Sequence, residues 1–257
     1  MLKGIDVSHH DPISLDFTGV DFVIMKATEG TAFEDNTFGY RMGITPHMLR
    51  GCYHFAHGND PRSEARHFDR VTHKYLGTFA PVLDFEIEIT NPVRWCEEFV
   101  DEYHALTGVY PMFYVGAHFP HQNMCALFDD SWIPDVCALW IAGYPAPPIN
   151  HWIERECPYP CGKWGNPDIW QFTSTLDLNG CPVDGNLAYM TETGFESLYG
   201  VDDMTVNELL DTKVHTSYGD LTVRDLLAWT YSYTRDIQPV IFDLQKRVKD
   251  LEKRKDD

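Results

Sequence analysis

The chain has 257 residues, of which 44% are hydrophobic, enough for one sizeable core and a shorter appendage. It has no run of about eighteen apolar residues, which argues against a membrane-spanning helix. Its formal net charge of −19 argues against nucleic-acid binding, because phosphate contacts need clustered Lys and Arg.

Eight short apolar segments are typical of β-strands, and helix-like segments separate the first of them. They are "GIDVSH" (4–9), "VDFVIMKATEG" (20–30), "RGCYHFAHG" (50–58), "APVLDFEIE" (80–88), "YPMFYVG" (110–116), "CALWIAGY" (137–144), "DIWQFTST" (168–175) and "PVDGNLAY" (182–189). This alternation predicts an α/β chain with a largely parallel sheet. After about residue 144 the sequence is rich in Pro and aromatic residues, so we expect a modified TIM-type β/α barrel with a helix-poor second half.

The clearest helix is predicted over residues 91–108. Asn91 is expected to cap it, Pro92 to take its first position and Gly108 to end it. The inner stripe would be Val93, Cys96, Val100 and Tyr103.

The composition changes after the predicted barrel of residues 1–198. Residues 199–235 are expected to form a short helical linker region, with capping boxes in "MTVNELL" (204–210) and "LTVRDLL" (221–227). Residues 236–257 are expected to form a helix that makes the protein a homo-oligomer, the alternative being that it packs on the barrel. Its heptad seam is Ile237, Ile241, Leu244, Val248 and Leu251.

The first residues, "MLKGIDVSHH", contain no apolar stretch of the kind found in a secretory signal. We therefore expect synthesis in the cytoplasm and another route to any site of action outside the cell.

The seven cysteines are an odd number and are scattered, which favours reduced, mostly buried thiols. Cys157, Cys161 and Cys181 leave open a local disulfide, and Cys157 and Cys161 with His151 leave open a metal site. No fourth ligand stands at a zinc spacing, and adjacent His9 and His10 would face opposite ways in a strand, so no metal or other cofactor is expected.

The segment "PVLDFEIE" (81–88) places two acids at the end of an apolar strand. Residues two apart in a strand share a face, so the Cα atoms of Asp84 and Glu86 would lie about 6.5 Å apart. Neighbouring carboxylates raise each other's pKa, which suits general acid and base catalysis, whereas Glu88 is expected to be solvated.

Polar residues also end the other predicted strands. Among them are Asp6, Glu29, Tyr53, Tyr114, Trp140, Gln171 and Asp184. Because the carboxyl ends of parallel barrel strands meet at one mouth, we expect these side chains to gather there. Carboxylates surrounded by Trp and Tyr indicate a site for a sugar polymer.

Seven motifs occur in order along residues 1–190: "GIDVSHH", "FVIMKATEG", "GCYHFAHG", "VLDFE", "LWIAGY", "WQFTST" and "VDGN". With them the chain resembles glycoside hydrolase family 25, the Chalaropsis-type lysozymes (muramidases) common among phage endolysins. The resemblance implies an eight-stranded barrel that hydrolyses the β-1,4 bond between N-acetylmuramic acid and N-acetylglucosamine in peptidoglycan. It implies an endolysin that lyses the host cell wall after release.

By this resemblance Glu86 is the general acid and Asp84 the second catalytic carboxylate, and Asp6 and Asp184 support the pair. Tyr53, Tyr114, Trp140, Gln171 and Glu29 are expected to contact the substrate. We favour substrate-assisted retention, in which the 2-acetamido oxygen attacks the anomeric carbon. Two departures from the family pattern are Phe85, in place of a smaller aliphatic residue, and Gly185, which is expected to loosen Asp184.

Two other functions are compatible with the pattern. One is an inactive wall-binding or virion structural protein on the same barrel, against which the intact acids argue. The other is a chitinase-like barrel, but the alternating aspartates ahead of the catalytic Glu in that family are missing here, because Pro81, Val82 and Leu83 precede Asp84.

Overall fold

The computed structural model describes residues 1–118, 123–200, 213–216 and 219–222. The chain divides into two compact units, Met1–Val201 and Asp202–Asp257. The first unit contains the whole of the predicted barrel of residues 1–198. The proposed division of the remaining residues at 235 stays a prediction.

The first unit is a closed barrel of eight strands. In chain order they are β1 (Leu2–Val7), β2 (Phe22–Glu29), β4 (Leu49–Phe55), β5 (Ala80–Asp84), β6 (Met112–Gly116), β7 (Leu139–Ala142), β8 (Ile169–Leu178) and β9 (Cys181–Ala188). Each corresponds to one of the eight predicted segments, and pairing of β1 with β2 closes the barrel. A short strand missed by the sequence reasoning, β3 (Phe33–Glu34), pairs antiparallel with the end of β2.

Apart from β3, the strands from β1 through β8 are parallel, but β9 runs antiparallel to both of its neighbours, β8 and β1. The hairpin between β8 and β9 turns through Asn179 and Gly180, whose φ values of 53° and 88° are those that a type I′ turn requires. The expectation of a largely parallel sheet is therefore confirmed, with one antiparallel strand at the closure.

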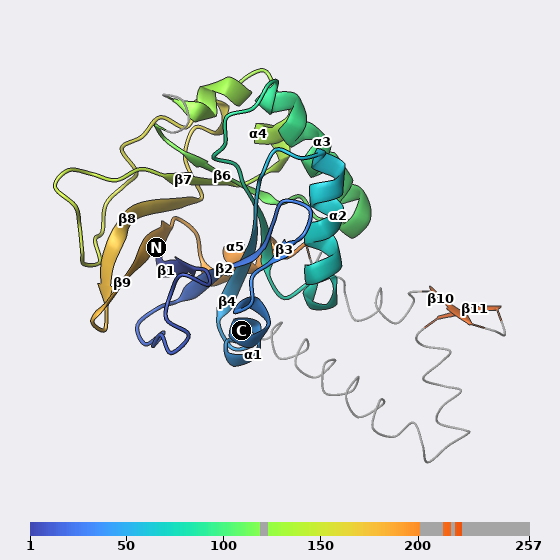
Figure 1. The fold of residues 1–257 in the computed structure, drawn as a ribbon, viewed down its shortest axis with the longest axis horizontal. Coiled ribbons are helices and arrows are strands. Elements are labelled where there is room, and N and C mark those ends of the chain that lie inside the picture. Colours follow the sequence, from blue (N-terminus) through green and yellow to red (C-terminus); the bar gives the residue numbers. More distant parts are fainter. Residues whose placement is uncertain (119–122, 201–212, 217–218, 223–257) are drawn as a thin grey trace, which may run out of the picture. The chain divides into compact units, whose positions relative to one another are not determined.

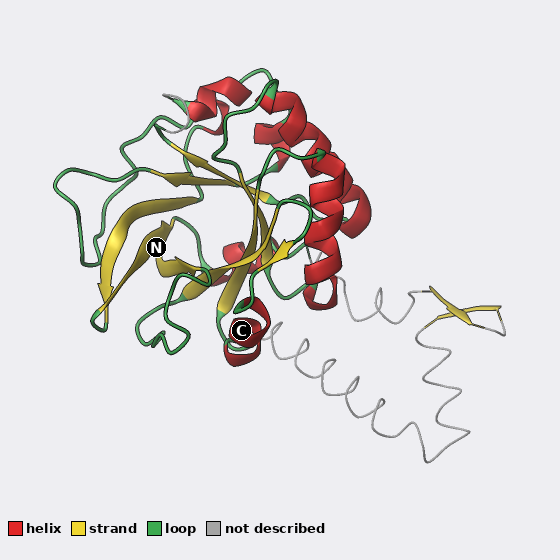
Figure 2. Cartoon of the chain, viewed as in Figure 1, coloured by secondary structure: helices red, strands yellow, loops and turns green. Residues whose placement is uncertain are grey.

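In Figure 2 the two longest helices lie along the right side of the barrel, whereas loops and the β8–β9 hairpin occupy the left. The longer ones are α1 (Phe38–Ile44), α2 (Pro61–Thr72) and α3 (Pro92–Thr107). Among the described residues of the second half the helices are short: η2 (Met124–Phe128), α4 (Ile133–Val136), η3 (Gly162–Trp164) and α5 (Glu192–Ser197). In the first half η1 (His73–Tyr75) follows α2. The prediction of a helix-poor second half is confirmed.

The predicted helix over 91–108 is α3. Pro92 opens it and Gly108 ends it with a φ of 76°. The expectation that the Asn91 side chain caps the helix is wrong, because Asn91 has a φ of 56° and its side chain makes no capping hydrogen bond. In the inner stripe Cys96, Val100 and Tyr103 are buried, while Val93 is half-buried.

Alternation along the strands sorts their side chains into two layers. One set faces the helices and loops, as Val23, Leu83 and Phe113 do. The other set fills the barrel, with Phe22, Ile24 and Val82 among its members. At the carboxyl end of the barrel this inner set becomes polar, and Lys26 and Asp84 continue the rows of Ile24 and Val82. The apolar side chains inside the barrel therefore pack directly beneath the polar side chains at its carboxyl end.

In the second unit the structure describes a hairpin of β10 (Lys213–Thr216) and β11 (Gly219–Thr222). This hairpin lies within residues 199–235, for which a short helical linker region was predicted, and the helical assignment of the rest of that region stays a prediction. The 204–210 repeat and the heptad segment 236–257 lie outside the described residues. Within the described part of the chain, no helix is long and apolar enough to cross a membrane.

Candidate active site

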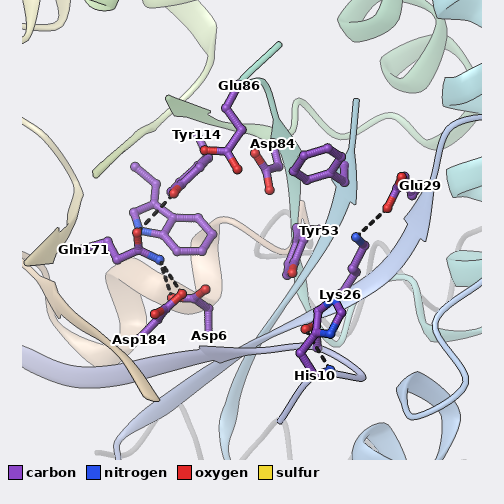
Figure 3. A pocket seen from close by; sticks show the side chains of 13 residues that line it. Asp6, His10, Lys26, Glu29, Tyr53, Asp84, Glu86, Tyr114, Gln171 and Asp184 are labelled. Atoms are coloured by element: carbon purple, nitrogen blue, oxygen red, sulfur yellow. Dashed lines mark hydrogen bonds and ion pairs between the residues drawn. The ribbon is translucent and has the colours of Figure 1, made fainter. Parts of the chain in front are cut away.

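A cavity of about 390 Å³ opens at the carboxyl ends of the barrel strands (Figure 3). All nine residues expected at the site line it: Asp6, Glu29, Tyr53, Asp84, Glu86, Tyr114, Trp140, Gln171 and Asp184. Ser8, His10, Lys26 and Phe55 complete the lining. The prediction that strand-end side chains gather at one mouth of the barrel is therefore confirmed.

Asp84 and Glu86 are not two residues of one strand, which corrects the expected geometry. The strand β5 ends at Asp84, and Glu86 stands in the loop that follows. Backbone hydrogen bonds continue the alternation for one more residue, because the Phe85 N–H donates to the Tyr114 carbonyl at 3.0 Å. Phe85 is fully buried on the helix side, so both carboxyls still point into the cavity (Figure 3).

The pKa of each of these two carboxyls is raised. Burial is the main cause for Asp84, followed by the charge of Glu86, and Oδ1 of Asp84 has no hydrogen-bond partner. Burial followed by the charge of Asp6 raises the pKa of Glu86, which is less enclosed than Asp84. Lys26 lowers the pKa of both acids. A pair of this kind holds a proton at a pH where an exposed carboxyl would have lost it.

A second carboxyl pair lies across the cavity. Asp6 on β1 and Asp184 on β9 are direct partners in the antiparallel register. Burial raises the pKa of Asp6 to about 6, and burial with the charge of Asp6 raises that of Asp184 to about 8. Like charges directly opposite each other destabilise a sheet, so this pair is favourable only when it retains a proton.

Two buried amides orient Asp6. Its Oδ2 accepts hydrogen bonds from Gln171 Nε2 at 2.8 Å and from Asn186 Nδ2 at 2.7 Å. Gln171 Nε2 also lies 3.4 Å from Asp184 Oδ2. The Asn186 oxygen in turn accepts from the Trp140 indole N–H at 2.8 Å, which fixes that ring at the cavity wall.

Tyrosine hydroxyls complete the network from the other side of Gln171. The Gln171 oxygen accepts from Tyr114 at 3.0 Å and from Tyr144 at 2.7 Å. Tyr114 is also the register neighbour of Asp84 on β6, so Gln171 is hydrogen-bonded both to Asp6 and to a tyrosine beside the second carboxyl pair.

Lys26 is the one lysine or arginine among the cavity residues. Its Nζ donates to Glu29 Oε2 at 2.7 Å. Lys26, Asn186 and Tyr144 also stand at the ends of predicted strands, but the sequence alone assigned no role to them or to Phe55. The signal for Phe55 was its position at the end of β4, two residues after Tyr53.

The other expectations concern cysteine, metal and glycine. All seven cysteines are free thiols, and five of them are buried. Among the described residues no group of three or more His, Cys, Asp or Glu side chains is placed to hold a metal ion. Gly185 is closely packed, since a Cβ there would lie 3.0 Å from Thr173 Cγ2 and 3.1 Å from Leu176 Cβ.

Comparison with known proteins identifies relatives of this barrel. The family "Glycosyl hydrolases family 25" matches residues 5–181. The N,O-diacetylmuramidase of Arthroderma benhamiae is 30% identical over 200 residues, which are 69% of this chain and 81% of that enzyme. Across the curated relatives, the match covers from 45% to 81% of their own length, and for most of them less than two thirds.

Solved structures have the same fold. The muramidase from Acremonium alcalophilum is 25% identical with a TM-score of 0.63, and the match covers 79% of this chain and all of that one, 100%. The catalytic domain of the endolysin ply40 from bacteriophage P40 of Listeria monocytogenes shares the fold at 24% identity, with a TM-score of 0.56 over 78% of this chain and 98% of that one.

Proposed function

The chain belongs to glycosyl hydrolase family 25, and from this premise we propose that it is an N-acetylmuramidase that cleaves the β-1,4 bond between N-acetylmuramic acid and N-acetylglucosamine in bacterial peptidoglycan. Membership of this family makes the chain a glycoside hydrolase of the lysozyme type and leaves no ground for the chitinase-like alternative. The observation that supports the proposal is the pair of Asp84 and Glu86, both with raised pKa and both turned into the cavity.

Glu86 is the proposed general acid. It lies nearer to solvent than Asp84 and so can reach the oxygen between two sugar rings. A general acid must carry its proton when substrate binds, and burial with the charge of Asp6 favours that protonated state. After the leaving sugar departs, the same carboxylate takes a proton from water.

Asp84 is the proposed second carboxylate, acting on the 2-acetamido group. In the substrate-assisted mechanism, the amide oxygen attacks the anomeric carbon and the amide N–H becomes acidic. Asp84 lines the cavity, and its carboxylate is the proposed acceptor for that N–H. A hydrogen bond from the substrate favours the ionised form of Asp84, so substrate binding leaves the proton of the coupled pair on Glu86.

The test is digestion of purified peptidoglycan followed by reduction of the products with borohydride. The proposal predicts new reducing ends on N-acetylmuramic acid. Reduced N-acetylglucosamine instead would assign a different bond, and absence of new reducing ends would contradict the proposal.

The Glu86→Gln variant separates catalysis from binding. It should lose lysis while keeping its melting temperature, because the amide has the shape of the acid but no proton to give. A wall-binding protein without activity would show no difference between the variant and the wild type in clearing a wall suspension or in co-sedimenting with walls.

We also propose that the protein serves as a phage endolysin, made in the host cytoplasm and acting on the wall after release. The ordered motifs through which the chain resembles a family common among phage endolysins are the reason for this proposal. Cells that express the full chain should then stay intact until their membrane is permeabilised with chloroform. Lysis without chloroform would contradict the release step.

Self-association through residues 236–257 is proposed from the heptad pattern, in which Ile241 and Val248 alternate with Leu244 and Leu251. Several barrels on one stalk would bind the wall with avidity. Light scattering on the full chain and on residues 1–200 tests this, and a monomeric full chain would refute it.

A further inference from the structure

The cavity extends beyond the acids toward β2 and the loop after β1. On this side its wall is made by His10, Lys26, Glu29 and Phe55, none of which hydrogen-bonds to the four carboxyls. Figure 3 shows Lys26, Glu29 and His10 together, apart from the carboxyls. Lys26 acts on Asp84 and Glu86 through its charge, but none of these four side chains donates or accepts a proton in the cleavage step described above.

Lys26 is held in a defined position. Its side chain is buried, and Nζ lies 4.7 Å from the centre of the Phe55 ring and 5.5 Å from that of Phe33. Glu29 accepts from Nζ and also lies 3.4 Å from Nδ1 of His57. A charged donor and a carboxylate acceptor are thus fixed next to two aromatic rings.

Phe33 extends this wall outward. The strand β3 places it directly opposite Glu29, and 41% of its surface is exposed. Its ring centre is 5.3 Å from that of His9, which is 3.9 Å from that of His10. His9 is anchored in turn, because its backbone N–H and its Nδ1 lie 2.8 Å and 2.9 Å from Asp35 Oδ2.

The result is a row of rings from the cavity to the surface: His10, His9 and Phe33. A solvent-exposed phenylalanine supported by a buried lysine contributes little to the core, and exposed apolar surface beside a cleft is typical of a binding site. The flat apolar faces of sugar rings suit such a surface, and sugar hydroxyl and amide groups suit a paired ammonium and carboxylate.

We propose that His9, His10, Lys26, Glu29 and Phe33 form a rim site that binds a sugar ring of the peptidoglycan strand beyond the two rings joined by the cleaved bond. The rim site rests on the proposed muramidase function and extends it to the polymer. It makes the enzyme select long glycan strands, with Phe33 providing the stacking face and Lys26 and Glu29 the polar contacts. A stem peptide is the competing occupant, and the aromatic row favours the sugar.

The test compares Phe33→Ala with the wild type on glycan strands freed of stem peptides by an amidase. On long strands KM should rise about fivefold to tenfold with kcat unchanged, the size expected for loss of one aromatic contact. On the shortest strand that the wild type cleaves, the two proteins should behave alike. Phe33→Trp should restore KM on long strands.

Tyr40→Ala is the matched control, because Tyr40 is an exposed aromatic on α1, 54% accessible, and unlike Phe33 it does not stack on His9 or face Lys26. Its kinetics should equal those of the wild type. Melting temperatures of all three variants show whether each is folded.

Two outcomes would overturn the rim site. One is a Phe33→Ala variant that is folded and has an unchanged KM on long stem-free strands. The other is a defect that appears only when stem peptides are present, which would assign the surface to the peptide. A wild type that produces no reducing ends would instead refute the proposed function, so the two failures are distinct.

Discussion

Gln171 connects more of the site than any other single side chain. Its oxygen accepts from two tyrosine hydroxyls and its nitrogen donates to the Asp6 carboxylate, so both ends of the amide have defined partners. The sequence places Gln171 at a strand end and indicates a substrate contact. In the structure it also orients the acids, which is a stronger constraint than contact with sugar.

Gln171→Met should separate these two roles. The thioether nearly fills the volume but cannot donate to Asp6, and leaving a buried polar partner unsatisfied costs about 1–3 kcal/mol. We expect a lower free energy of unfolding and a fall in kcat of about tenfold to a hundredfold through misplaced acids. Denaturant unfolding and initial rates measure both.

Tyr144→Phe is the milder comparison, since it removes only one of the bonds to Gln171 and Tyr144 is 48% exposed. If Gln171→Met raised KM and left both stability and kcat unchanged, Gln171 would be a substrate contact only.

The pH dependence of activity follows from Glu86. Its pKa is raised above the usual value of 4.5, so the protonated, active form persists as pH rises and is lost once pH passes the raised pKa. In the substrate complex, where the proton of the pair stays on Glu86, Asp84 takes up a proton only at lower pH, which should lower the rate again. A profile of kcat against pH, which reports the substrate complex, should therefore peak on the acid side of neutral, and a rate still rising above pH 8 would contradict this assignment.

At the scale of elements, β1 and β2 pack so closely that position 4 of β1 has room only for glycine. A Cβ on Gly4 of β1 would overlap the Phe22 ring of β2, which fills the bottom of the barrel. Gly4→Ala must therefore displace Phe22 or the strand, and overpacking of this kind typically costs about 1–3 kcal/mol.

Gly43→Ala is the matched substitution, because Gly43 lies within α1 and a Cβ there meets nothing within 4 Å. It should stabilise the fold by about 0.5–1 kcal/mol, the difference in helix propensity between the two residues. Thermal melts of the two variants should move in opposite directions. If both variants changed the melting temperature by the same amount and in the same direction, close packing against Phe22 would not be the reason for glycine at position 4.

The end of β5 shows how an element shapes the site. The alternation of "PVLDFEIE" predicts that Asp84 and Glu86 share a face, and they do, but only Asp84 belongs to the strand. Glu86 is placed by the loop, by the Phe85 hydrogen bond to Tyr114 and by burial of the Phe85 ring. Phe85 is therefore an anchor for the catalytic loop, which explains a large residue at this position.

At the scale of the whole barrel, the four acids should make stability depend on pH. In the unfolded chain Asp184 titrates near 4, whereas in the fold its pKa is about 8. Between these values the folded state binds more protons than the unfolded state, so stability is present at low pH and is lost as pH rises through 8.

The expected result is a melting temperature that falls between pH 6.5 and 8.5 in the wild type and falls less in Asp184→Asn. The asparagine has no proton to lose, so the difference between the two proteins reports on Asp184 and its partner Asp6, while titrations elsewhere in the barrel cancel. A shift of about 1 kcal/mol would appear as about 2–4 °C in a domain of this size. Parallel curves for the two proteins would contradict the raised pKa of Asp184.

The amino-acid sequence alone determined the eight strands and the set of side chains at the mouth. This was possible because both follow from local rules: apolar alternation marks each strand, and the direction of the chain places the carboxyl end of each parallel strand at the same edge. The nine residues assigned to the site by sequence all line one cavity for this reason. The helix over 92–107 was equally predictable from the sequence, since Pro92 and Gly108 mark its two ends.

Only the tertiary structure decided which of these residues touch. Asp6 receives hydrogen bonds from residues 165 and 180 positions away in the sequence, because β9 closes the barrel antiparallel to β1 and β8. The same closure places Asp184 opposite Asp6, and the two-residue strand β3 brings Phe33 to the rim of the cavity. Such contacts depend on strand register and on where the barrel closes, and these are set by packing between distant segments, for which no short stretch of sequence carries a signal.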